Sequence, residues 1–173
     1  DRDFSAQLTK LKQKSFDLLF IPGYLQETAP AISQARRMGI TAQSMGVFGD
    51  MAPKYIELAG KASEGHLNCS EYDEDYNTPT NKRFKDAYYR IVKADPKEPN
   101  NIMFAAITYD MTRMVAKAIA AKGGAPDQVR SYLDTVKDFD GVTGKLSFDK
   151  NGDVVKQGVY LFRVTGGKYV KVK

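Results

Sequence analysis

The stretch Phe16-Asp17-Leu18-Leu19-Phe20-Ile21-Pro22-Gly23-Tyr24 decides the fold class of this chain. It is a short apolar run that stops at Pro22-Gly23, and helical periodicity follows in residues 25–32. This pattern predicts a buried parallel strand that enters a βα loop. Because open α/β sheets bind ligands at the carboxyl ends of their strands, Tyr24 and the adjoining Gly23 are candidate ligand-binding residues. Position alone leaves open that Tyr24 only caps the core.

The segments around this strand repeat the alternation of helix and strand. Phe4, Leu8 and Leu11 recur at helical spacing after Asp3, which can cap that helix. Residues 25–38 predict a second helix, residues 41–47 a second strand, and residues 65–70 a third strand after a helix that begins near Pro53. The order α-β-α-β-α-β implies a parallel sheet with right-handed crossovers.

The second half of the chain does not continue the regular alternation of helix and strand. The acidic, turn-rich stretch 71–79 breaks the alternation and is the best candidate for a domain crossover. Helices are predicted over residues 80–94, 102–121 and around 129–136. Strands are predicted over 144–148, 159–164 and 169–172, with hairpin turns at Asn151-Gly152 and Gly166-Gly167.

Composition excludes several classes of protein and site. The 173 residues contain no apolar run near the roughly 20 residues of a spanning helix, and the charged start is no signal peptide, although a precursor could have lost one. The net charge of +5 is scattered, which favours a solvated basic surface over nucleic-acid binding. In the turn 149–153 the glycine falls too early for a calcium loop, and no glycine-rich phosphate loop follows a strand. No metal or cofactor is expected.

Six further residues are candidates for a functional site besides the Gly23-Tyr24 pair. His66 and Cys69 are the only residues of their kinds, and their odd spacing in a strand places them on opposite faces, which argues against an enzyme. Phe48-Gly49-Asp50 ends the second strand, where the glycine lets both side chains approach a ligand; an ordinary turn with a solvated carboxylate is the alternative. Phe104 could line a cleft or belong to the core, and the core is the preferred assignment.

Taken together, the motifs resemble the substrate-binding proteins of branched-chain amino acid ABC transporters, which have the type I periplasmic binding fold. The resemblance runs from end to end, and its motifs are specific in this order and spacing. They are Asp3–Leu8, Ile21-Pro22-Gly23-Tyr24 with Gln34-Ala35-Arg36 and Gly39-Ile40, Leu58-Ala59-Gly60 with Glu64-Gly65, Thr108-Tyr109-Asp110, Phe139–Gly144 with Phe148-Asp149, and Asn151-Gly152-Asp153.

The resemblance implies a domain organisation of parallel-sheet α/β lobes. Family members are longer and begin with a lobe that is absent here, so the chain corresponds to a C-terminal fragment. Matching positions place residues 1–73 in lobe two, 74–155 in lobe one and 156–173 back in lobe two. The resemblance also implies that sheet edges are completed by the missing N-terminal half or by a complementary chain.

The resemblance implies a protein that binds a small solute and catalyses no reaction. The lobes of the family close on a small solute outside the cytoplasm, in the periplasm or its equivalent, and a membrane permease recognises the closed form. Tyr24 matches the family's aromatic contact, whereas Phe48 stands where the family has an acid for the ligand ammonium. Unless Asp50 or Glu27 substitutes, this favours an aromatic or other apolar carboxylate over an ordinary amino acid. A ligand-sensing regulator of the same fold is the alternative function.

Overall fold

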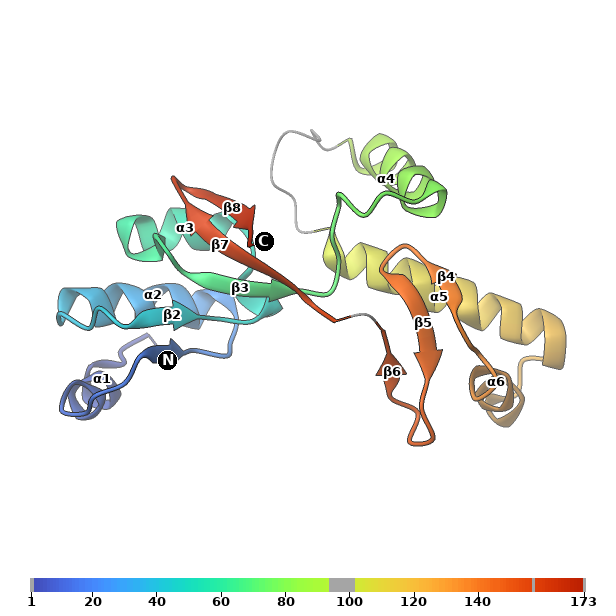
Figure 1. The fold of residues 1–173 in the computed structure, drawn as a ribbon, viewed down its shortest axis with the longest axis horizontal. Coiled ribbons are helices and arrows are strands. Elements are labelled where there is room, and N and C mark those ends of the chain that lie inside the picture. The colour runs from blue at the N-terminus through green and yellow to red at the C-terminus, as the bar shows by residue number, and fades with distance from the viewer. Residues whose placement is uncertain (1, 94–101, 157, 173) are drawn as a thin grey trace. The chain divides into compact units, whose positions relative to one another are not determined.

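A computed structural model describes residues 2–93, 102–156 and 158–172, and these residues form two compact units (Figure 1). Unit 1 comprises residues 2–70 and 160–172, and unit 2 comprises residues 71–93 and 102–159 where described. Each unit has its own helices, its own strands and its own buried core.

Unit 1 is built on a five-stranded sheet with the order β1-β2-β3-β7-β8. The first three strands are parallel, as predicted, and β7 and β8 are antiparallel to their neighbours. The strands are β1 (Leu18–Phe20), β2 (Gln43–Met45), β3 (Leu67–Ser70), β7 (Tyr160–Thr165) and β8 (Lys168–Lys171), and the helices are α1 (Ser5–Lys12), α2 (Leu25–Arg37), η1 (Phe48–Asp50), α3 (Pro53–Ala59) and η2 (Gly60–Ser63).

The core of unit 1 lies between its helices and one face of this sheet. Leu8 of α1, Leu19 of β1, Ile32 of α2 and Tyr55 of α3 are buried together. Strand β1 is at one edge of the sheet. Its residues Leu18 and Phe20 alternate with the buried Leu19 and are about half exposed, so β1 leaves apolar side chains in solvent. The period-2 alternation explains this pattern, because successive strand residues face opposite sides.

Unit 2 packs helices against a small antiparallel sheet with the order β4-β5-β6. The helices are α4 (Pro79–Val92), α5 (Met103–Lys122) and α6 (Pro126–Leu133), and the strands are β4 (Phe139–Gly141), β5 (Gly144–Phe148) and β6 (Val154–Val155). Thr78 caps α4, because its side-chain oxygen accepts from the Asn81 amide, and Pro79 fits the first turn. The predicted helices at 80–94 and 102–121 are therefore present, although residue 94 lies outside the described residues.

The predicted strands at 144–148, 159–164 and 169–172 are present as β5, β7 and β8. The turn at residues 149–153 forms as predicted, and β5 pairs across it with the two-residue strand β6, which was not predicted. Strand β7 pairs with β3 in unit 1. The turn at Gly166-Gly167 does connect β7 to β8, and positive φ angles of 58° and 77° at the two glycines explain its composition.

Candidate functional site

The carboxyl ends of β1 and β2 bring two of the predicted segments together. Tyr24 is the N-cap residue of α2 and 69% exposed, so it does not cap the core. Phe48 begins η1 and is 40% exposed. A methyl group added to Gly49 would lie 2.6 Å from the Gly23 carbonyl oxygen and 3.3 Å from Tyr24 Cδ1. Glycine at position 49 therefore allows the two loops to touch.

Asp50 does not share this exposed surface. Its side chain is fully buried, and Asn68 donates a short hydrogen bond to Asp50 Oδ1. The sequence predicts either that Gly49 lets the Phe48 and Asp50 side chains approach a ligand together or that Asp50 is solvated in an ordinary turn. In a 3₁₀ turn each residue advances by about 120°, so residues two apart point in different directions. The carboxylate thus points inward, and it is not an exposed partner for a ligand ammonium.

His66 lies next to Asp50 in the interior of unit 1. Its Nδ1 is 2.9 Å from Ser44 Oγ, and its Nε2 is 3.5 Å from Asp50 Oδ2. All three side chains have no exposed surface. The sequence did not reveal these partners, because they depend on the register that sets Met45 of β2 beside Leu67 of β3. The residue types are those of a hydrolase triad, but no substrate can reach a fully buried serine.

The surroundings of Asp50 include two tyrosines. The ring of Tyr55 lies 4.8 Å from the His66 ring, and its hydroxyl is buried without a hydrogen-bond partner among the described residues. The hydroxyl of Tyr169 donates to the carbonyl oxygens of Asp50 and Ala52, each at 3.2 Å. Burial first, and the Asp50 charge second, raise the pKa of both phenols well above the usual value. Both hydroxyls are therefore neutral.

Phe104 belongs to the other unit. It lies in the first turn of α5 and is 50% exposed, so it is not part of the core of unit 2. Gly23, Tyr24, Phe48 and Gly49 are therefore brought together within unit 1, and Phe104 lies in unit 2.

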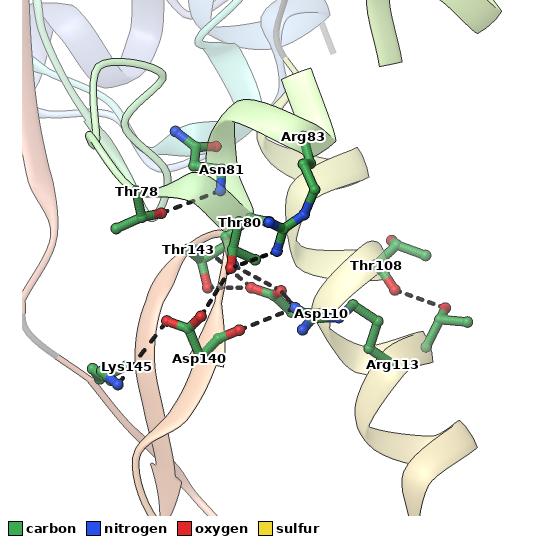
Figure 2. Close-up of polar contacts among 12 residues, drawn as sticks. Thr78, Thr80, Asn81, Arg83, Thr108, Asp110, Arg113, Asp140, Thr143 and Lys145 are labelled. Carbon is green, nitrogen blue, oxygen red and sulfur yellow. Dashed lines mark hydrogen bonds and ion pairs between the residues drawn. The ribbon is translucent and has the colours of Figure 1, made fainter. Parts of the chain in front are cut away.

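Unit 2 holds a second buried carboxylate, which joins two of the segments that carry the resemblance (Figure 2). Asp110 of α5 is 1% exposed and accepts from the Val142 amide at 2.8 Å and from the Thr143 amide and hydroxyl at 2.9 Å. Arg113 donates to the Asp140 carbonyl oxygen at 3.0 Å. A methyl group on Gly141 would lie 2.6 Å from Asp110 Oδ2. Asp110 therefore fixes the β4–β5 turn against α5.

The residues that the structure describes contain neither a group of metal ligands nor a membrane-spanning helix. No three His, Cys, Asp or Glu side chains are grouped so that they could hold a metal ion. In the same residues, no helix combines the length and the hydropathy that crossing a bilayer requires.

Comparisons with known proteins agree on one family. A family model for periplasmic binding proteins matches residues 1–168. The leucine-, isoleucine-, valine-, threonine-, and alanine-binding protein of Pseudomonas aeruginosa is 33% identical over 157 residues, which are 89% of this chain and 40% of the relative. The leucine-specific-binding protein of Salmonella typhimurium is 32% identical over 179 residues, 98% of this chain and 45% of the relative.

Solved structures give the same result. A leucine-binding protein from Thermotoga maritima superposes with a TM-score of 0.87 at 29% identity, over 100% of this chain and 48% of that one. The branched-chain amino acid transporter substrate-binding protein from Streptococcus pneumoniae, solved with isoleucine, gives a TM-score of 0.77 at 33% identity over 99% and 49%. The chain spans less than half the length of each of these relatives. It belongs to the periplasmic binding protein family and has the type I fold of those relatives.

Proposed function

We propose that this chain is part of the extracytoplasmic solute-binding component of an ABC importer, which delivers a small organic solute to a membrane permease. The observation that supports the proposal is the pair of exposed aromatic side chains, Tyr24 and Phe48, on adjoining loops at the carboxyl ends of two parallel strands. Ligands of open α/β sheets bind at this end. Family membership makes binding without turnover the activity to test first.

We assign the lobes of the family to the two units as separate bodies. Unit 1 corresponds to lobe two and unit 2 to lobe one. The half-exposed Leu18 and Phe20 on the edge strand β1 favour a further segment that covers them, since large apolar side chains on an open edge promote association. The remaining length of the relatives, or a complementary chain, would supply that segment.

The solute class follows from the surface around Tyr24 and Phe48. Asp50 is buried and bonded to Asn68, so among the acids weighed for a ligand ammonium only Glu27, in the first turn of α2, is exposed. An unpaired ammonium in an apolar site is costly. Unless Glu27 pairs with the ammonium, aromatic or branched carboxylates are therefore expected to bind more tightly than leucine or valine.

The test is a calorimetric panel on the full-length protein with L-leucine, L-valine, benzoate and phenylacetate. If a solute covers half of the exposed Tyr24 ring, Tyr24→Ala removes about 60 Å² of apolar contact, or about 1.5 kcal/mol and tenfold in affinity. Unchanged affinity for every solute that binds would remove Tyr24 from the site. Binding of leucine alone would overturn the solute class and point to Glu27 as the ammonium partner.

A further inference from the structure

A chain of polar groups, three of them fully buried, runs through unit 1 from Arg36 to Asp50. Arg36 of α2 donates to the carbonyl oxygens of Ile40 and Ala42, and its second terminal nitrogen lies 3.2 Å from Ser44 Oγ. Ser44 contacts His66 Nδ1, and His66 Nε2 faces Asp50 Oδ2. The sequence of groups Arg36–Ser44–His66–Asp50, here called the buried relay, therefore ends at the last residue of η1.

One assignment of the protons along the buried relay starts from its first member. A guanidinium only donates, so Ser44 Oγ accepts from Arg36 and its single hydroxyl proton is free to donate to His66 Nδ1. With Nδ1 as the acceptor, the ring proton of a neutral imidazole is on Nε2. Nε2 lies 3.5 Å from Asp50 Oδ2, a contact longer than a hydrogen bond, and neither atom has a hydrogen-bond partner among the described residues.

Asn68 contacts both ends of the 3₁₀ turn η1. Its amide nitrogen donates to Asp50 Oδ1 and, at 3.3 Å, to the Val47 carbonyl oxygen, so it bridges the residue before η1 and the last residue of η1. Gly46 leaves room for this arrangement, because a methyl group there would collide with the Asp50 carboxylate. A buried carboxylate is tolerated only when donors compensate its lost hydration. Asn68 donates to Asp50 Oδ1, and His66 Nε2 lies 3.5 Å from Asp50 Oδ2.

The backbone of η1 contributes little rigidity of its own. Its two closing bonds, from the Asp50 amide to the Val47 oxygen and from the Met51 amide to the Phe48 oxygen, are both 3.3 Å long. Short 3₁₀ turns have poor hydrogen-bond geometry. What holds Asp50 therefore contributes to the direction of Phe48.

We infer that Asp50 and His66 are positioning residues of the binding surface: the buried relay, with Asn68, anchors η1 and so holds Phe48 toward the solute. This inference rests on the proposed function, since it concerns the surface formed by Tyr24 and Phe48. The two residues touch no solute, because neither has any exposed surface. They act through Phe48.

The first test needs no ligand and measures backbone hydrogen exchange in the full-length protein. His66→Leu removes both ring contacts, whereas His66→Gln retains an N–H near the Nε2 position. We expect exchange of the Asp50 and Met51 amides to rise about tenfold in His66→Leu and to stay near wild type in His66→Gln. The control is Leu8→Ala, a core truncation in α1 that loosens unit 1 without touching the buried relay. A rise no greater in His66→Leu than in Leu8→Ala would overturn the inference.

The second test is a double-mutant cycle on the affinity for benzoate and for L-leucine. His66→Leu is expected to weaken binding about tenfold in the wild-type background and less than twofold when Phe48 is already alanine, because the effect passes through Phe48. An equal loss in both backgrounds overturns the inference and leaves the proposed function standing. If Phe48→Ala and Tyr24→Ala change neither affinity, the proposed binding surface is wrong, and the inference of a role in binding is overturned with it.

Discussion

Gly49→Ala tests whether the loops of Tyr24 and Phe48 form one surface. The added methyl group would lie 2.6 Å from the Gly23 carbonyl oxygen and 3.3 Å from Tyr24 Cδ1. Non-bonded carbon and oxygen atoms rarely come closer than about 3.2 Å, so the loops must separate by about half an ångström. Overpacking of this kind costs about 1–3 kcal/mol. The backbone at Gly49 needs no left-handed φ, so alanine also returns about 0.5 kcal/mol through the unfolded chain.

The net expectation for Gly49→Ala is a loss of about 1–2 kcal/mol in the free energy of unfolding, measured by denaturant titration of the full-length protein. Because the methyl group also pushes against the Tyr24 ring, affinity for a bound carboxylate should fall about three- to tenfold by calorimetry. Gly124→Ala is the matched control, since an added methyl group there contacts nothing within 4 Å. If both variants unfold and bind alike, the two loops do not touch in solution and the surface has been assembled wrongly.

The parallel half of the sheet in unit 1 was predictable because its signals are local. The apolar run before Pro22 and the helical periodicity after it each specify one element, and right-handed crossovers then align the strands. Local signals do not specify which sheet residues 159–164 join, and only the resemblance, which assigns residues 156–173 to lobe two, bears on it. Asn151-Gly152 specifies a turn but not the length of the returning strand, so β6 ends at Val155 and the next strand joins a different sheet.

The interior of the site was hidden for a different reason. Asp50 and Phe48 are two residues apart, and only the 3₁₀ geometry of η1 separates their directions. His66 meets Ser44 because β2 and β3 pair in one register, and a shift of one residue would turn either side chain to the other face. A single sequence carries no direct record of that register. A lone histidine therefore gave no sign of its partners.

Two further predictions concern the buried polar groups of each unit. Tyr55→Phe should leave the free energy of unfolding unchanged or raise it by about 1 kcal/mol, since it removes a buried hydroxyl that has no hydrogen-bond partner among the described residues. Tyr169→Phe should lower the free energy of unfolding by about 1 kcal/mol, because it removes the hydrogen bonds of that hydroxyl. Burial raises the pKa of both phenols, so their contribution to stability is complete below about pH 10 and declines above it as the unfolded chain ionises. Tyr55→Phe should therefore reduce the alkaline loss of stability, and an unaltered alkaline profile would count against its burial. In unit 2, Asp110→Asn keeps the side-chain shape but turns an amide N–H either toward the Val142 amide or toward the Thr143 amide and hydroxyl. Because these donors are buried, the variant should lose about 3 kcal/mol in denaturant titration, and a loss below about 0.5 kcal/mol would show that the β4–β5 turn does not depend on the carboxylate.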